Sequence, residues 1–506
     1  MSPAGQRMRR VWFGAILLWD ALETIGATWM FSDDVRGSHT AVDTSVHSDA
    51  VDRRPLPPLP AVLPPKRPDE FLLVMMGGST AGGDPYSPVH NNLYTSGFSF
   101  IEAVQMRLQQ LFPKLRVESA KLALGGGTLE DAYRLLCRLR VHPDVIVVYS
   151  GHNELFTRFS PDDEAWEEDT SPAPDYGIAR GLFPPSLLAR CIEDRLKTFA
   201  VTALPPDRNR RRLFDRPLFT PAAAEQIYQR FRETLVEIVS FCRRQDIQPI
   251  LIIPAANESG FDPSRSWLPV DFPEEKRQQL VAIYAQLDTD RPDEQTRVAL
   301  LESAFELASE FAETCFRLGQ EYENQGRFTD ALRCYQSAID CDGYPLRASS
   351  RFADIYRDVA ERFDAHLIDA RDVLRPLSAN GILGDDLIHD NCHPNVVGYT
   401  ALANATLHAV HELHGSDLNW PASFEELTPR DLVRYFMIDR AKWAEVFDFV
   451  GRDFSDNLSL LRYDPALRLR KGRAYRAAAA EIEMGTWQWN NGISDSRVFS
   501  PAAAAP

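Results

Sequence analysis

Two short segments, far apart in the sequence, contain residue types that together can do nucleophilic chemistry. Ser79 follows an apolar run and two glycines in the segment GGST, and Asp390 precedes His393 by three positions in HDNCHP. A serine hydroxyl is a weak nucleophile until a base takes its proton, and an imidazole is a better base when a carboxylate holds its other ring nitrogen. We therefore expect Ser79 to act as nucleophile, His393 as general base and Asp390 as the group that orients His393.

The residue order of the glycine-rich segment excludes several known binding and catalytic motifs. A phosphate-binding P-loop ends in Gly-Lys-Ser/Thr, whereas Gly82 and Gly83 are followed by Asp84. The segment spells neither the dinucleotide fingerprint GxGxxG nor the GxSxG elbow of α/β-hydrolases. An ordinary glycine turn, in which Ser79 or Thr80 caps the next helix, remains an alternative.

A metal site is an alternative for the second segment. His389, Asp390, Cys392 and His393 all carry atoms that bind metal ions. Four ligands so close in sequence rarely converge on one ion without a distant partner, so we favour the acid-base interpretation and expect no metal and no cofactor.

The elements that would position these groups alternate between strand and helix. The apolar run Phe71 to Met76 is typical of a strand buried on both faces of a parallel sheet. Further strands are expected at 116–124, 144–149, 249–254 and 366–370, and helices at 98–112, 128–139, from Pro221 onward, and from Tyr399 to about Leu413. This alternation predicts a three-layer α/β/α sandwich with a five-stranded parallel sheet.

Two of the later strands are followed by groups that could stabilise an oxyanion. Gly126 offers a backbone N–H after the second strand, and Asn153 offers a side-chain amide after the third. Each also has an ordinary structural meaning, as a tight turn for Gly126 and as a helix cap for Asn153. Because the carboxyl ends of parallel strands lie at one edge of the sheet, we expect all these groups to meet there.

At this point the chain resembles the SGNH (GDSL-type) hydrolase family, in a branch that carries a tetratricopeptide (TPR) unit. The family's four blocks correspond to GGST (77–80), the glycine Gly126, GHNE (151–154) and DNCH (390–393). The resemblance implies Ser79, Asp390 and His393 as the catalytic triad, and the Ser79 N–H, Gly126 and Asn153 as the oxyanion hole. Gly78 and Glu154 depart from the pattern, because many members have Asp at both places.

Length and composition are those of a large soluble globular protein. The chain has 506 residues, of which 44% are hydrophobic and 25% charged. The net charge of −17 argues against binding of nucleic acid or anionic lipid through the whole surface, because phosphate contacts need clustered Lys and Arg. The seven cysteines include no CxxC pair, which favours buried, reduced thiols.

The sequence divides into segments of different character. Residues 1–32 are interpreted as an N-terminal anchor or an amphipathic helix. Arg7, Arg9 and Arg10 precede the apolar stretch 11–31, but Asp20 and Glu23 within it disfavour insertion. The protein is therefore expected either in the cytoplasm or attached to a membrane. Residues 33–66 form a proline-rich linker outside the core.

The hydrolase domain is expected at 67–413, with insertions at 160–219 and 262–345 and a helical region at 414–506. In the second insertion, positions from Leu318 to Ala338 keep the spacing of a single TPR unit, which indicates a helical insertion that could also bind a protein partner. The last region is predicted to pack around Trp420, Tyr435, Phe436, Trp443 and Phe447, without chemistry of its own.

These features together predict a serine esterase acting on a small-molecule or carbohydrate ester. An O-acyltransferase would use the same acyl-enzyme and pass the acyl group to an alcohol. A non-catalytic adaptor would use the TPR-like helices and should have lost one of the four blocks. Asn257, His90 and Tyr86 lie near predicted strand ends and could line the pocket, although we favour turn or capping roles for each of them.

Overall fold

The computed structural model describes residues 55–155, 221–458 and 466–487, apart from positions 68, 88, 91, 92, 95, 96, 270, 290, 291, 379 and 422. The predicted N-terminal segment 1–32, the first part of the linker and the insertion 160–219 lie outside the described residues. All described residues belong to one compact unit, Ser48–Pro506. Within the described ranges, no helix has the length and apolarity that a membrane crossing requires.

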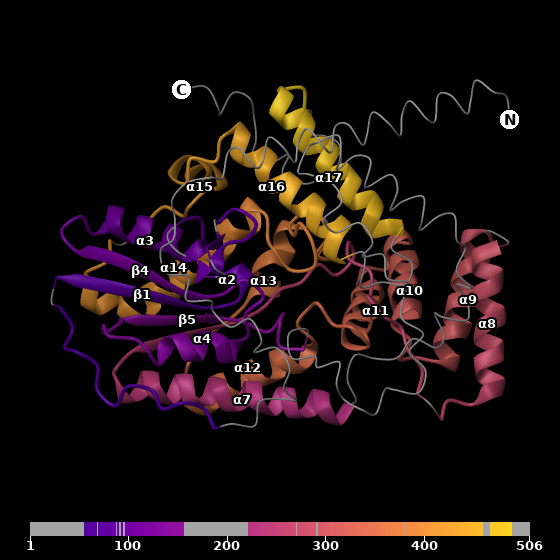
Figure 1. The fold of residues 1–506 in the computed structure, drawn as a ribbon, viewed down its shortest axis with the longest axis horizontal. Helices are drawn as coiled ribbons and strands as arrows, with labels where there is room; N and C mark the ends of the chain where they lie inside the picture. Colours follow the sequence, from indigo (N-terminus) through magenta and orange to yellow (C-terminus); the bar gives the residue numbers. More distant parts are fainter. Residues whose placement is uncertain are drawn as a thin grey trace, which may run out of the picture. The chain divides into compact units, whose positions relative to one another are not determined.

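A five-stranded parallel sheet forms the centre of this unit (Figure 1). Its spatial order is β4-β1-β5-β6-β7. The strands are β1 (Glu70–Gly77), β4 (Arg116–Ala123), β5 (Val145–Tyr149), β6 (Gln248–Ile253) and β7 (His366–Asp369). A separate antiparallel pair, β2 (Val89–His90) and β3 (Leu93–Tyr94), precedes α3 and was not predicted.

Helices cover both faces of the sheet, and alternate residues of β1 divide between the two. Leu73 and Met75 point into a core shared with α3 (Phe100–Leu111), α13 (Ala370–Leu374) and α14 (Val396–Leu418). Val74 and Met76 point into a second core, shared with α4 (Leu129–Leu136), α7 (Pro221–Arg244) and α12 (Ser350–Phe363). Because both faces are covered, all of β1 after Glu70 is buried, as its unbroken apolar run predicts. The predicted three-layer α/β/α fold is confirmed.

The helical insertion has a core of its own. It consists of α8 (Glu274–Thr289), α9 (Glu294–Leu307), α10 (Ala312–Asn324) and α11 (Phe328–Asp340). Helices α10 and α11 lie side by side as a hairpin (Figure 1). Gly319 allows their close approach, because a Cβ there would lie 2.9 Å from the Tyr335 ring. Ala331 and Ala338 are fully buried in this core.

The C-terminal helices pack on the same core as the sheet. They are α15 (Pro429–Tyr435), α16 (Arg440–Asp453) and α17 (Ala466–Met484), and Trp443, Phe447 and Tyr475 belong to the cluster that includes Leu73 of β1. Trp443 and Phe447 are fully buried, as predicted, but Tyr435 is 48% exposed. The prediction for Tyr435 is wrong because α15 buries only Leu432.

Two other sequence boundaries differ from the structure. The closing helix α14 begins at Val396 rather than Tyr399, because the Asn395 side chain caps it by accepting the Gly398 N–H. The end of the proline-rich segment joins the core instead of staying outside it, since Leu63 is buried and its N–H donates to Gln245.

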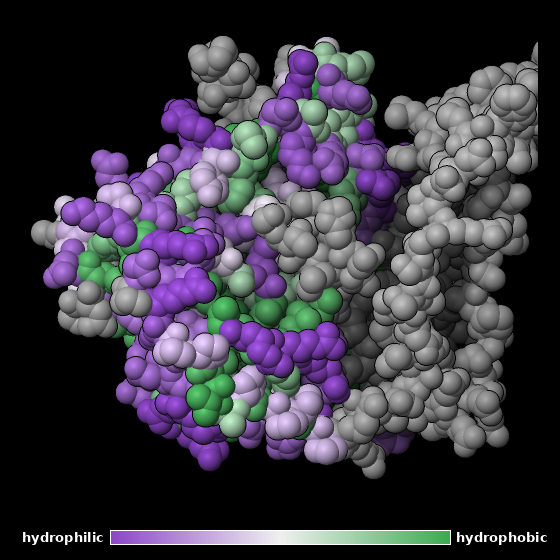
Figure 2. Space-filling view, turned by 60° about the vertical axis from the view of Figure 1, so that its left-hand side comes forward, coloured by the Kyte–Doolittle hydropathy of each residue, from purple (hydrophilic) through white to green (hydrophobic). Residues whose placement is uncertain are grey.

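The described surface is mostly hydrophilic, and the described cysteines are free. Hydrophilic residues predominate over the described part of the face in Figure 2, with hydrophobic residues between them. Six of the seven cysteines are described, and all six are free: Cys137, Cys242, Cys315, Cys334, Cys341 and Cys392. Cys137 and Cys341 are half-buried and the other four are buried, so the buried-thiol prediction holds for most of them.

Candidate active site

The predicted site residues follow strands at the point where the strand order of the sheet reverses. Numbered along the chain, the five strands lie in the order 2-1-3-4-5, so the reversal falls between β1 and β5. In open α/β sheets, ligands bind in the crevice at the carboxyl ends of the strands at such a point. Ser79 follows β1 and Asn153 follows β5, and the two strands remain paired up to Gly77 and Tyr149.

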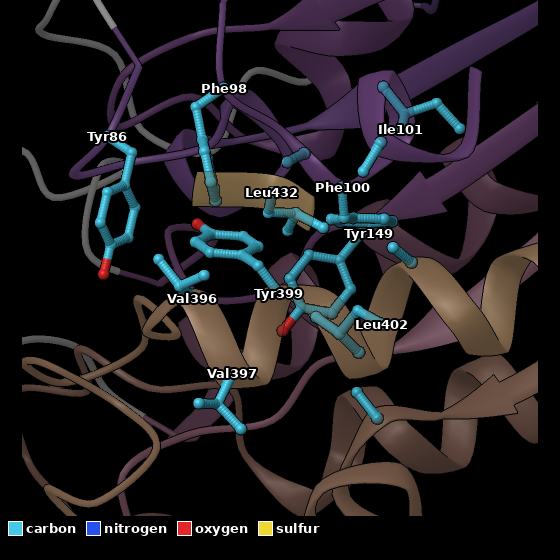
Figure 3. Close-up of a cluster of buried hydrophobic side chains, with 14 of the residues drawn as sticks. Tyr86, Phe98, Phe100, Ile101, Tyr149, Val396, Val397, Tyr399, Leu402 and Leu432 are labelled. Carbon is cyan, nitrogen blue, oxygen red and sulfur yellow. The ribbon is translucent and has the colours of Figure 1, made fainter. Parts of the chain in front are cut away.

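Ser79 is the first residue of the short helix α2 (Ser79–Gly82), directly after β1. The turn that follows needs a glycine at Gly83, because φ is +102° and a Cβ would lie 1.8 Å from the Phe98 carbonyl oxygen. The Tyr399 hydroxyl of α14 donates to the carbonyl oxygens of Asp84 and Thr80, at 2.6 and 3.2 Å. Its ring lies beside Phe98 in the apolar cluster of Figure 3. The segment that carries Ser79 is therefore held by the backbone at Phe98 and by the Tyr399 hydroxyl.

Ser79, His393 and Asp390 form one chain of hydrogen bonds. His393 Nε2 lies 2.8 Å from Ser79 Oγ, and His393 Nδ1 lies 2.7 Å from Asp390 Oδ2. The second oxygen of Asp390 accepts the backbone N–H groups of Cys392 and His393, both at 2.9 Å. With its proton on Nδ1, the imidazole presents Nε2 as an acceptor to the serine hydroxyl. The structure thus brings together the three residues for which the sequence predicted nucleophilic chemistry.

Asp390 and His393 stabilise each other's charged form. Burial disfavours the imidazolium, but the charge and hydrogen bond of Asp390, with Asp84 and Asp453 further away, outweigh burial and raise the pKa of His393 above 6.5. Burial would also raise the pKa of Asp390, but His393 and the two backbone N–H groups lower that pKa to about 2. Asp390 is therefore ionised at neutral pH, and a positive charge on His393 is stabilised.

The loop that carries Asp390 and His393 is held by buried amides. Asn257, fully buried after β6, donates to the Asp390 carbonyl oxygen at 2.8 Å and to the Asp385 side chain at 2.9 Å. Asn391 donates from its side chain to the Leu346 carbonyl oxygen. Asn257, one of the residues considered as pocket lining, thus has a structural role. The side chain of His90 lies outside the described atoms.

Asn153 and Glu154, which follow β5, both contact the region where α4 begins. Asn153 Nδ2 donates to the Gly127 carbonyl oxygen at 3.0 Å. A Cβ at Gly78 would lie 2.6 Å from this Nδ2, so a residue with a side chain would collide there. Glu154 is buried and accepts the Leu129 N–H at 2.8 Å, which ties the end of β5 to the start of α4.

Gly126 lies in the turn between β4 and α4. Its φ is +68°, the left-handed region that glycine adopts easily, and a Cβ there would meet open space. This is the tight turn that the sequence allowed. The next residue, Gly127, supplies the carbonyl oxygen that binds Asn153, so the turn lies next to the predicted oxyanion donor.

The residues considered for a metal site are only partly together. Asp390, Cys392 and His393 each have a ligand atom within 4.8 Å of the others, but these atoms of Asp390 and His393 already bond to each other and to Ser79. His389 lies apart from this group and contacts Tyr86, whose hydroxyl is 2.7 Å from its Nε2. The arrangement fits the acid-base interpretation more closely.

His389 connects the loop that carries Asp390 and His393 to the C-terminal helix α17. It is fully buried, with Tyr86 on Nε2 and the hydroxyl of Tyr475, from α17, 3.4 Å from Nδ1. The Tyr475 hydroxyl also donates to the His389 carbonyl oxygen at 3.1 Å, and the His389 N–H donates to the His393 carbonyl oxygen at 2.9 Å. Sequence reasoning found no chemistry in residues 414–506, and nothing in the pattern around Tyr475 signals this contact.

We expect His389 to make the fold sensitive to acid. Burial lowers its pKa in the folded protein to about 4, against 6.5 unperturbed. As the pH falls from 6.5 to 4, the unfolded chain takes up this proton before the folded one, so stability decreases. In this range His389 lowers the free energy of unfolding by about 1.4 kcal/mol for each unit by which the pH falls. The shift of His393 acts above pH 6.5 and that of Asp390 below pH 3.8, so neither opposes it in this range.

Urea unfolding at pH 7.0, 5.5 and 4.5 measures this dependence. The free energy of unfolding should fall less steeply with pH in His389→Gln than in the wild type, whatever the stability of the variant at pH 7. An equal slope in the two proteins would show that His389 does not carry the effect.

Comparison with known proteins gives no family assignment. No protein-family model matches the sequence, and no curated protein matches it. Among solved structures, LAE5, an α/β hydrolase from the metagenome of Lake Arreo in Spain, is 17% identical, with 67% of this chain and 94% of that chain covered and a TM-score of 0.29.

Two acetylxylan esterases are similar at the same level. Axe2 from Geobacillus stearothermophilus is 12% identical, with 68% of this chain and 95% of that chain covered and a TM-score of 0.30. AlAXEase is 13% identical, with 67% and 100% covered and a TM-score of 0.29. Likeness at these values concerns the fold only and assigns neither reaction nor substrate to this chain.

Proposed function

We propose that this chain is a serine hydrolase of the SGNH type that cleaves an ester through an acyl-enzyme on Ser79. The observation that carries the proposal is the continuous hydrogen-bond chain from Ser79 Oγ through His393 to Asp390, at 2.8 and 2.7 Å. An imidazole held in this way can take the proton of a serine hydroxyl, and the buried carboxylate can stabilise the imidazolium that results.

The reaction would proceed in two halves. Ser79 Oγ attacks the ester carbonyl carbon while His393 Nε2 takes its proton, and His393 then gives that proton to the leaving alcohol oxygen. Water attacks the acyl-enzyme with His393 again as base, which releases the acid and restores Ser79. The oxyanion of each tetrahedral intermediate would be bound by the Ser79 N–H, the Gly126 N–H and the Asn153 side chain. Each such donor contributes about 3 kcal/mol to the transition state.

The substrate class that we propose is a small-molecule or carbohydrate ester. Ser79 is 9% exposed and the His393 side chain 13%, so only a small part of a substrate can lie directly against them. The helical hairpin α10–α11 keeps TPR spacing, and binding of a protein partner there is a separate proposal that leaves the chemistry unchanged.

A fluorophosphonate probe tests the proposal, because it phosphonylates only an activated serine in a folded site. Full-length protein is treated with the probe, digested, and analysed by mass spectrometry, with heat-denatured protein as the control. We expect one label, on the peptide containing Ser79, in the folded protein only. Folded protein that stays unlabelled, or that is labelled elsewhere, would reject the proposal. Candidate alcohols added with a reactive ester then show whether the acyl group passes to an acceptor.

A further inference from the structure

His152, the residue before Asn153, has a buried ring nitrogen without a hydrogen-bond partner. Its Nδ1 accepts the Ala348 N–H at 3.2 Å, whereas Nε2 has no partner in the part of the chain that the structure describes. The residue is 6% exposed. Burial, helped by the nearby His393, lowers the pKa of His152 to about 3, so its ring is neutral at neutral pH. A neutral imidazole whose Nδ1 accepts must carry its proton on Nε2, so the unpaired group is an N–H donor.

His152 lies near His393 and Asp390, whose charges both act on its ring. It follows β5 at the strand-order reversal and immediately precedes Asn153, whose Nδ2 lies next to Gly78, the residue before the nucleophile. The backbone that holds its Nδ1 also holds the catalytic loop, because Leu346, two residues before Ala348, accepts a hydrogen bond from Asn391. His152 is thus fixed relative to both halves of the site.

An unpaired N–H in such a place calls for an explanation. The large majority of buried polar side-chain atoms in proteins are paired, and leaving one unpaired costs about 1–3 kcal/mol. The other ring nitrogen of His152 is paired, so rotation of the ring would only exchange one unpaired group for another. The missing acceptor is therefore best supplied by a molecule that enters the site.

We propose that Nε2–H of His152 donates a hydrogen bond to the ester group of the bound substrate, in addition to the three donors proposed for the oxyanion. The inference rests on the proposed function. A neutral donor suits this place, because a charged imidazolium would repel the positive charge that develops on His393 as it takes the serine proton. No proton transfer is assigned to His152, which binds and orients the reacting group.

Two substitutions separate this role from a purely structural one. In His152→Asn, the shorter amide can still accept the Ala348 N–H through its oxygen, but no donor remains at the place of Nε2. In His152→Gln, the amide nitrogen reaches the place of Nε2 as a donor, while the acceptor for Ala348 is lost. Donation to the substrate and support of Ala348 are therefore removed one at a time.

The measurements are kcat and KM for p-nitrophenyl acetate, the rate of fluorophosphonate labelling, and the melting temperature. We expect His152→Asn to lower kcat by about 10²- to 10³-fold, the size typical for loss of one oxyanion donor, with KM changed little and the melting temperature not lowered. His152→Gln should keep kcat within about tenfold of the wild type although it melts earlier. The labelling rate should fall in the same order.

The outcomes that overturn the inference differ from those that overturn the proposed function. If the wild type reacts at Ser79 and His152→Asn keeps its kcat, the donor serves only the fold and the inference fails alone. It also fails if Gln impairs catalysis as much as Asn does, since activity then follows the Ala348 contact. If the wild type neither hydrolyses the ester nor takes the label, the proposed function fails and this inference falls with it.

Discussion

Replacing Ser79 by alanine is expected to lower kcat/KM for p-nitrophenyl acetate by about 10⁵- to 10⁶-fold, the size of effect seen when a triad serine is removed. The neighbouring Thr80 cannot take over, because its hydroxyl faces the Cys392 sulfur at 3.9 Å rather than His393. Alanine suits the first turn of a helix, and the substitution removes only the hydrogen bond to His393 Nε2. The melting temperature should therefore stay close to that of the wild type.

A matched control is Ser87→Ala. Ser87 is also buried, a few residues further along the same segment, and its hydroxyl accepts a long hydrogen bond from Lys121 at 3.5 Å. We expect this variant to keep kcat/KM within about twofold, because Ser87 lies outside the hydrogen-bond chain to Asp390. Should the Ser79 variant retain activity within tenfold of wild type, the hydrolysis would belong to another residue and the proposed mechanism would be wrong.

The fold could be predicted because its central sheet is buried on both faces. A strand covered by helices on each side must be apolar at every position, so Phe71 to Met76 stands out as an unbroken run. The central strands β5 and β6 are apolar for the same reason, and the sequence also located the edge strands β4 and β7, which are mostly half-buried. All four were expected within two residues of their observed bounds. Parallel strands then place every strand end at one edge, which is why residues so far apart as Ser79 and His393 could be expected to meet.

What could not be predicted depends on contacts that leave no local pattern. The Tyr475 hydroxyl reaches His389 from a helix that is otherwise an ordinary packing element, so the sequence gives no reason to choose this tyrosine among fifteen. The unpaired Nε2 of His152 can be recognised only when the structure shows that Nδ1 accepts the Ala348 N–H. Gly78 is required by its distance to Asn153, which belongs to another strand end. Each of these is a fact of tertiary packing.

Closing helix α14 is an intermediate case. The segment Asn395-Val396-Val397-Gly398 contains a preferred capping residue directly before an apolar run, which is the usual signal for a helix start. From the sequence we predict a start at Tyr399, because residues 384–398 are grouped with the segment of Asp390 and His393. The structure shows that the loop and the cap are contiguous, since His393 is followed within two residues by Asn395, whose side chain caps the helix. The helix α14 thus begins three residues after His393.

Asp390→Asn should lower kcat/KM at neutral pH by about 10⁴-fold, as for the corresponding change in a serine-protease triad. The oxygen of the new amide can still accept the backbone N–H groups of Cys392 and His393, so the loop keeps its shape. The amide nitrogen, however, then faces His393 Nδ1 as a donor and forces the ring proton onto Nε2. An imidazole in that tautomer cannot accept the proton of Ser79. Asp372→Asn, an exposed change on α13, serves as the control and should leave kcat/KM unaffected.

The pH profile of the same pair of proteins gives an independent test. Catalysis needs neutral His393, and in the wild type Asp390 raises the pKa of that imidazole, so kcat/KM should rise with pH through a midpoint above 6.5. Removing the carboxylate charge leaves burial as the main influence, which lowers the pKa of His393. The residual activity of Asp390→Asn should therefore have its midpoint at lower pH than the wild type. A midpoint that stays in place would mean that the titrating group is not the imidazole paired with Asp390.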